Sequence, residues 1–404
     1  NPIFSQTNSV DQDLSRLVFS SLVSFNGAGE LVPDLADSYS IDDAQSVYTF
    51  TLKPNLTWHD GLPLTAADVA FTIQSIKDPN FKSPLYNTFR NVQVKLIDET
   101  TLELVLPEPF APFLSLLTFG ILPEHLWQEI DPTHAALAEL NLKPIGSGPY
   151  QFSSLVKDKK GNIKEYSLKR FSNWYGQGPF IANISFKFFS TLDEAVTNVK
   201  DGNADGLGMV ANTQNSELAS QTDKKAYRLG LPQYTALFFN QATNAALAEK
   251  PVREALSLAI NREQIIANTF TDSAKPINGP LLGEAEVIFD PSQAEAKLES
   301  AGWKKVANTD QAPYTRQKNV KSSAGETATT LEIKLTTVQK EENIQAAETI
   351  RELWLAIGVK VNLEIVDIAQ IQKSIIKPRA YEVLLFGQIL GGDPDPYPFW
   401  HSSQ

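Results

Sequence analysis

Cysteine is absent from all 404 residues of this chain. The chain therefore cannot use a thiol nucleophile, form a disulfide bond or bind a metal through thiolates. Histidine is also scarce: the four residues are His59, His125, His134 and His401, without the paired spacing of a zinc site. The sequence also lacks a run of about 18 apolar residues, the length that a membrane-spanning helix needs.

Basic residues are outnumbered by acidic residues in this chain. The chain has 35 Lys and Arg against 47 Asp and Glu, a net charge of −12. Nucleic acids and anionic membranes are bound by clustered Lys and Arg, so this total argues against both partners, although it can hide a local basic patch. The composition, 42% hydrophobic and 20% charged, is typical of a folded protein, and the length predicts two or three domains.

Familiar catalytic motifs are missing as well. "WHDG" (58–61) places a His beside an Asp, but we interpret it as a turn before a helix. "GSG" (146–148) lacks the spacing of a nucleophile elbow and predicts a tight turn. Asp393 and Asp395 could act as paired carboxylates or calcium ligands, although a stiff turn that contacts a ligand is the favoured interpretation. We therefore expect no catalytic residue, no metal and no cofactor.

Hydrophobic periodicity predicts alternating helices and strands. Helices are expected at 9–22, 64–76, 192–201, 250–259, 262–270, 291–302, 342–356 and 368–376. Strands are expected at 47–54, within 92–106, at 182–189, 225–230, 234–240, 331–337, 359–366 and 381–387, with a hairpin over 150–171 and a polar stretch at 307–330. The alternation after residue 330 predicts an α/β fold with a largely parallel sheet and right-handed crossovers.

The last of these strands leads into a candidate binding loop. "QILGGDPDPYPFW" (388–400) follows the apolar strand and gathers Gly, Asp and aromatic residues. In parallel α/β sheets, ligands bind outside the carboxyl ends of the strands. The sequence therefore predicts that this loop faces a ligand.

Six stretches, in this order, resemble the family 5 extracellular solute-binding proteins of ABC importers, which include dipeptide, oligopeptide and nickel binders. They are "LTWHDGLPLTAADVAFTIQSI" (56–76), "PIGSGPYQF" (144–152), "KDGNADGL" (200–207), "FFNQATNAALAEKPVREALSLAINREQII" (238–266), "DPSQAEAKLESAGW" (290–303) and "DPDPYPFWHSSQ" (393–404).

The resemblance implies a two-lobed, periplasmic-binding-protein-like fold of type II, the Venus-flytrap fold, with an extra subdomain inserted in lobe I. Lobe I is expected over 1–240, with the inserted subdomain over 31–143, and lobe II over 241–404. Family members continue beyond the position of Gln404, so lobe II is expected to be truncated here.

The implied function is that of a periplasmic or extracellular receptor, anchored as a lipoprotein. It would capture a small solute, a peptide or a similar molecule, by hinge closure and deliver it to a membrane-embedded ABC permease. Such a receptor performs no chemistry, binds no nucleic acid and is expected to be a monomer.

The expected ligand contacts are Gln388, Ile389, Leu390, Gly391, Asp393, Thr7, Thr337 and Lys340. Peptide binders of the family often hold the ligand's amino terminus with an Asp where this chain has Leu390, so a neutral or differently oriented ligand is favoured. Lys340 could pair with a ligand carboxylate. Two alternatives remain open: a glycoside-active enzyme that uses a carboxylate pair, and the ligand-sensing domain of a regulator.

Overall fold

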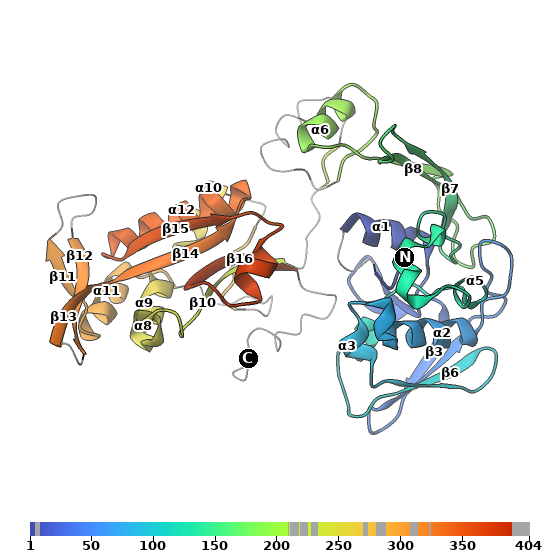
Figure 1. Ribbon diagram of the computed structural model, residues 1–404, viewed down its shortest axis with the longest axis horizontal. Helices are drawn as coiled ribbons and strands as arrows, with labels where there is room; N and C mark the ends of the chain where they lie inside the picture. The colour runs from blue at the N-terminus through green and yellow to red at the C-terminus, as the bar shows by residue number, and fades with distance from the viewer. Residues whose placement is uncertain are drawn as a thin grey trace. The chain divides into compact units, whose positions relative to one another are not determined.

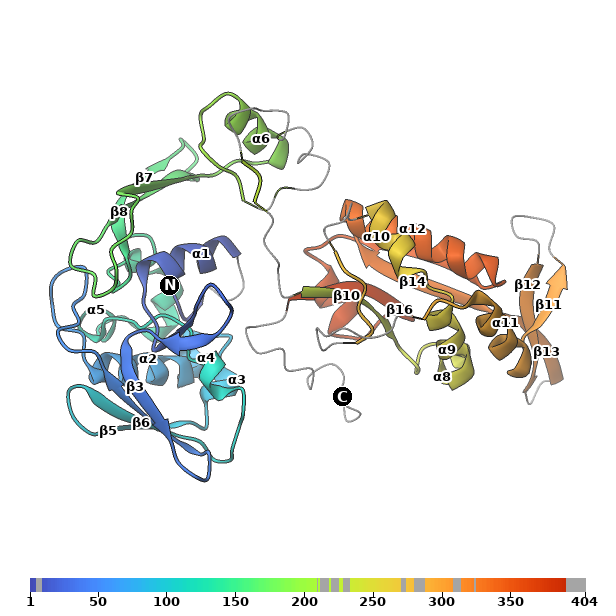
Figure 2. The ribbon, with the colours of Figure 1, turned by 180° about the vertical axis from the view of Figure 1, so that it is seen from behind.

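A computed structural model of the protein is shown in Figures 1 and 2. The residues that it describes are 1–4, 9–208, 210, 218, 225–227, 233–269, 274–279, 288–307, 314–322 and 325–389. The chain forms two compact units, Asn1–Met209 and Val210–Gln404. Each unit has a hydrophobic core built from its own residues.

The division between the units falls earlier than the lobe boundary that we expected at residue 240. The difference concerns strand β10 (Gln233–Phe239), which we had placed in lobe I. This strand pairs antiparallel with β16 (Val383–Ile389) along its whole length, so it belongs to the sheet of the second unit. The assignment of lobes to residue ranges and the inserted subdomain at 31–143 remain predictions.

The first unit is centred on a four-stranded antiparallel sheet in the order β3-β4-β6-β5. Its helical and strand segments are α1 (Ser9–Val18), β1 (Val23–Phe25), β2 (Leu31–Pro33), β3 (Ala36–Ile41), β4 (Val47–Leu52), α2 (Ala66–Lys77), η2 (Pro79–Phe81), α3 (Tyr86–Phe89), β5 (Gln93–Leu96), β6 (Thr101–Val105), α4 (Phe113–Leu116), α5 (Glu124–Trp127), η3 (Pro132–Leu137) and η4 (Glu139–Asn141). The alternation predicted for β4 is confirmed, because Tyr48, Phe50 and Leu52 are buried while the residues between them are half-buried. Helix α2 packs against the sheet through strands β5 and β6.

A second sheet of the first unit contains the hairpin predicted over 150–171. Its strands β7 (Tyr150–Lys157) and β8 (Ile163–Arg170) pair antiparallel, and β9 (Asn183–Lys187) adds to β8. Helix α6 (Leu192–Lys200) follows, with the Thr191 side chain accepting a hydrogen bond from the backbone N–H of Glu194 at its start. Both the hairpin and this helix agree with the sequence prediction.

The second unit is centred on a mixed sheet in the order β10-β16-β14-β15, with β14 parallel to both of its neighbours. Its other segments are α8 (Ala245–Ala248), α9 (Lys250–Leu258), α10 (Arg262–Thr269), α11 (Pro291–Ser300), β11 (Lys304–Ala307), β12 (Tyr314–Ser322), β13 (Gly325–Thr330), β14 (Glu332–Val338), α12 (Glu341–Ala356), β15 (Lys360–Val366) and the π-helical turn η5 (Gln372–Ile376). The parallel part of the sheet confirms the predicted β-α-β pattern after residue 330.

Alternate residues of β16 lie in different cores. Val383 and Leu385 belong to the cluster formed with α9, α11 and α12, whereas Leu384 and Phe386 pack with Ile371 and other residues around η5. Both faces of this strand are therefore covered, which is why it reads as one continuous apolar run rather than as an alternating one. Figure 2 shows α12 running alongside the sheet.

Candidate functional site

The site that the sequence predicts lies at one edge of the sheet in the second unit. Strand β14 is parallel to both β15 and β16, so the carboxyl ends of the three strands point to the same edge of the sheet. Helix α12 begins there, directly after β14. The backbone N–H of Gln339 donates to the carbonyl of Val366 at 2.9 Å and so ties the end of β14 to the end of β15. This edge is the position at which open α/β sheets bind ligands.

Thr337 holds this edge together. Its side chain is fully buried, and its hydroxyl donates to the carbonyl of Leu385 at 2.9 Å. The same oxygen accepts a hydrogen bond from the Asn343 amide, in the first turn of α12, at 3.4 Å. The hydroxyl thus joins β14, β16 and the start of α12, a placement that favours a positioning role over direct contact with a ligand.

Lys340 lies at the N-cap position of α12 and is exposed. Its backbone N–H donates to the carbonyl of Val338 at 2.8 Å, which turns the chain from strand into helix. Among the residues that the structure describes, its ammonium group has no ion pair. A lysine in this position can approach an anionic group outside the strand ends, so its predicted pairing with a ligand carboxylate stays a prediction.

The remaining predicted contacts are only partly covered by the structure. Gln388 and Ile389 end strand β16, and they pair with Tyr234 and Gln233 of β10, beyond the last pair between β16 and β14. The strand therefore extends past its parallel neighbour at the candidate edge. Thr7, Leu390, Gly391 and Asp393 lie outside the described residues.

Sequence reasoning missed two residues near this edge. One is Asn343, whose amide bonds to Thr337. The other is Glu364 of β15, which accepts a hydrogen bond from the Thr336 hydroxyl at 2.7 Å and lies 3.3 Å from the Lys334 ammonium. The parallel register Thr336↔Glu364 brings these side chains together. The sequence gives the residue types, but the register that pairs them comes only from the fold.

Hydrogen bonds of His59 join the "WHDG" turn to the "GSG" loop of the first unit. His59 Nδ1 accepts from the backbone N–H of Gly146 at 3.1 Å, and Nε2 donates to the carbonyl of Gly148 at 3.0 Å. Burial lowers the pKa of His59 to about 4, so the ring is neutral near pH 7. "WHDG" is confirmed as a turn, with Gly61 at φ 86°. Both ring nitrogens are held by backbone groups, so neither is available as a base.

The glycines of "GSG" are required by close packing against α1. A Cβ at Gly146 would lie 2.0 Å from the carbonyl oxygen of Val18, and one at Gly148 would lie 2.6 Å from that of Leu17. The N–H of Gly148 donates to the Val18 carbonyl at 2.8 Å. This contact also explains why α1 ends at Val18, although the predicted helix continued to residue 22.

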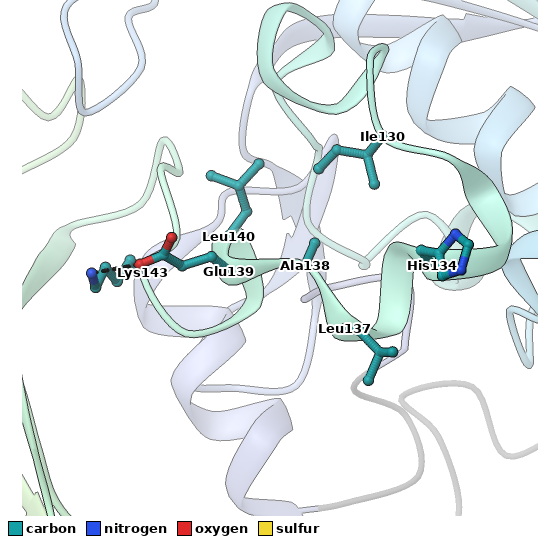
Figure 3. Close-up of a pocket in the computed structure, with 7 residues that line it drawn as sticks. All are labelled: Ile130, His134, Leu137, Ala138, Glu139, Leu140 and Lys143. Atoms are coloured by element: carbon teal, nitrogen blue, oxygen red, sulfur yellow. Dashed lines mark hydrogen bonds and ion pairs between the residues drawn. The ribbon is translucent and has the colours of Figure 1, made fainter.

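An open depression of about 580 Å³ lies on the first unit, beside η3 and η4 (Figure 3). It is lined by Ile130, His134, Leu137, Ala138, Glu139, Leu140 and Lys143. Glu139 and Lys143 form an ion pair with a distance of 2.6 Å. The lining comes from one continuous stretch of chain, without the convergent polar groups of several elements that a ligand site normally has. We do not assign a ligand to it.

In the described ranges, three or more His, Cys, Asp or Glu side chains nowhere gather in a way that could hold a metal ion. Among the helices that the structure describes, none has the length and apolar character that crossing a bilayer requires.

Comparison with known proteins identifies the family. Residues 30–404 match the profile of the bacterial extracellular solute-binding proteins, family 5. An ABC transporter peptide-binding protein of Brucella ovis is 28% identical over 291 residues, which are 68% of this chain and 53% of that protein. A glutathione-binding protein of Pectobacterium atrosepticum is 25% identical over 314 residues, 74% of this chain and 58% of that protein. The chain thus spans little more than half the length of these relatives.

Solved structures agree with this assignment. The NikZ protein of Campylobacter jejuni, solved in complex with Ni(L-His), is 27% identical, with a TM-score of 0.77 over 100% of this chain and 78% of that one. The chain belongs to family 5 of the bacterial extracellular solute-binding proteins, and it has their two-lobed type II fold. This result confirms both the resemblance and the fold class that the sequence predicted.

Proposed function

We propose that the protein is a solute receptor of an ABC importer, which captures a small ligand between its lobes and delivers it to a membrane permease. The match over residues 30–404 carries this proposal, since the family is one of extracellular solute-binding proteins. The candidate edge of the second unit supports it, because the ends of three strands and the start of α12 meet there. Ligand binding would shift the lobes toward the closed state by its greater affinity for that state.

The receptor performs no chemistry in this proposal. His59 is neutral near pH 7, and both of its ring nitrogens are held by backbone groups, so it is not available as a general base. The alternatives of a glycoside-active enzyme and of a regulator's sensory domain have no observation in their favour. A periplasmic or extracellular location, a lipoprotein anchor and a monomeric state belong to the same proposal.

The ligand is proposed to be a peptide or a similar solute that is not held by a free amino terminus. Names of relatives include peptide and glutathione binders, and a related structure contains Ni(L-His). Leu390 stands where peptide binders of the family often have an Asp, so a ligand ammonium group would lack its counter-ion here. Lys340 would instead attract a carboxylate or another anion.

Calorimetry on wild type and Leu390→Asp tests this proposal. The variant should bind free dipeptides about ten- to a hundredfold more tightly, because one buried charge-assisted hydrogen bond contributes about 1.5–3 kcal/mol. Leu137→Asp, at a leucine with 84% exposure in the first unit, is the matched control and should change nothing. Tight binding of unmodified dipeptides by the wild type would refute the assignment of Leu390. Mass spectrometry of the copurified ligand would then give its class directly.

A further inference from the structure

The hairpin of β7 and β8 differs in charge from the rest of the protein. Residues 150–188 contain seven Lys and Arg but only two carboxylates, a net charge of +5 in a chain whose total is −12. Four of the lysines lie at or beside the turn of the hairpin: Lys157, Lys159, Lys160 and Lys164. We call these four residues the basic tip. Figures 1 and 2 show the hairpin at the periphery of the first unit.

All four side chains of the basic tip are exposed. Within the described part of the chain, none of their ammonium groups takes part in a hydrogen bond or a salt bridge. The shape of the tip instead depends on backbone and amide contacts. The four charges are therefore displayed by a folded turn, and none of them is needed to hold that turn.

Asp158, the acid within the tip, is the residue that fixes the turn. Its carboxylate accepts hydrogen bonds from the Asn162 amide at 3.0 Å and from the backbone N–H groups of Asn162 and Lys160 at 2.9 and 2.8 Å. The hydrogen bond from the Asn162 side chain is the main cause that lowers the pKa of Asp158. The carboxylate thus offsets part of the positive charge but has a structural role of its own.

Glu139, an acid outside the hairpin, is already paired. Glu139 forms its ion pair with Lys143, and the hydrogen bond to Lys143 is the main cause that lowers the pKa of Glu139. Lys157 contributes a weaker electrostatic effect that lowers the pKa of Glu139 in the same direction. Among the described residues Glu139 forms its ion pair with Lys143 and none with Lys157, so the charge of Lys157 is not neutralised by an ion pair there.

We propose that the basic tip docks on an anionic lipid surface. Lysines carry flexible point charges without the planar fork with which arginine recognises one carboxylate or phosphate group. Protein interfaces are depleted in lysine and enriched in aromatic residues and arginine, none of which occurs at the tip. A diffuse layer of anionic headgroups matches such a set of charges better than a defined pocket on another protein.

The acidic character of the whole chain does not prevent this contact. Exposed charges more than about 8 Å apart are largely screened at physiological ionic strength. Only the groups nearest the bilayer then determine the attraction, and these are the four lysines with Asp158 and Glu165. This contact is distinct from solute capture. It would bring the first unit to the membrane that contains the permease, whether or not a ligand is bound.

Vesicle binding tests the proposal without a transporter or a ligand. Wild type is sedimented with vesicles of phosphatidylglycerol and phosphatidylcholine, one to three, and with vesicles of phosphatidylcholine alone. Binding is expected only to the anionic vesicles, and it should weaken strongly between about 50 mM and about 300 mM salt. Each lysine near an anionic surface contributes about fivefold to partitioning. Lys157→Gln/Lys159→Gln/Lys160→Gln/Lys164→Gln should therefore bind at least about fiftyfold more weakly.

Two controls make the result specific. Lys225→Gln/Lys275→Gln/Lys373→Gln/Lys377→Gln removes four exposed lysines of the second unit and should bind like wild type. Substituting the four tip lysines by arginine should preserve binding, because the charge is retained. The proposal is wrong if wild type ignores anionic vesicles at low salt, or if the two glutamine variants lose binding equally. It is also wrong if the tip is needed for binding to the purified permease but not to vesicles, since the partner would then be an acidic protein surface.

Discussion

At the scale of single residues, burial and hydrogen bonding together determine the protonation state of His59. His59 Nδ1 accepts from the N–H of Gly146, so that nitrogen cannot carry a proton in the folded state without losing the contact. Burial of the ring is the main cause that lowers its pKa to about 4, below the ordinary 6.5. His59 is therefore a fixed neutral link between the "WHDG" turn and the "GSG" loop.

The stability of the first unit should for this reason depend on pH through His59. Between about pH 6.5 and pH 4 the unfolded chain binds a proton that the folded state excludes, so the free energy of unfolding falls as the pH falls. The loss is at most about 3 kcal/mol and is complete near pH 4. Urea unfolding of wild type and His59→Gln between these pH values measures it. His134→Gln changes an exposed histidine and is the control: its free energy of unfolding should depend on pH as that of wild type does. The prediction is wrong if His59→Gln also keeps the wild-type pH dependence.

At the scale of elements, the sequence predicted best what hydrophobic spacing determines. Helix α12 and strands β14 and β15 lie within one residue of their predicted bounds. The sequence missed β11, β12 and β13. The polar stretch 307–330 has no apolar alternation, and its strands β12 and β13 join β11 in a three-stranded sheet through backbone pairing, with Arg316 buried beside it. The helix expected at 368–376 is a shorter π-helical turn, and of the strand expected at 225–230 only 225–227 are described, without regular structure.

At the candidate site, too, the sequence predicts local structure but not the contacts between distant strands. The strand-end position of Thr337 and Lys340 could be predicted, because strand and helix boundaries follow from local pattern. The burial of the Thr337 hydroxyl and its bond to Leu385 could not, since they depend on the register between β14 and β16. A pairing between distant strands is a tertiary property that one sequence does not reveal.

The small sheet of β11, β12 and β13 should depend on Arg316 of β12. Its fully buried guanidinium donates to the carbonyls of Ile357 and Trp303 at 2.7 and 3.0 Å and to the Glu299 carboxylate at 3.2 Å. A lysine cannot satisfy these acceptors together, so Arg316→Lys should destabilise the second unit by about 3 kcal/mol. Arg351→Lys, at a partly exposed surface pair, should cost less than about 0.5 kcal/mol. Equal urea midpoints for the two variants would contradict this prediction.

At the scale of the whole molecule, the hydrophobic cores follow the division into units. The largest cluster consists of residues from the first unit, and the other two consist of residues from the second. Hydrophobic burial is the main favourable term in folding, so each unit contains the core that its own stability requires. In the proposed receptor, lobes that coincide with these units would move relative to one another without disruption of either core.

We therefore expect core substitutions to act on one unit at a time. Phe50→Ala removes a fully buried ring from the first core, and Leu335→Ala a fully buried side chain from the second. Each should cost about 3–5 kcal/mol. Hydrogen exchange measured by mass spectrometry should show loss of protection in Asn1–Met209 for the first variant and in Val210–Gln404 for the second. If either variant lowered protection in both units to the same extent, the two units would unfold as one cooperative structure, and lobe motion would then have to be accompanied by changes within the cores.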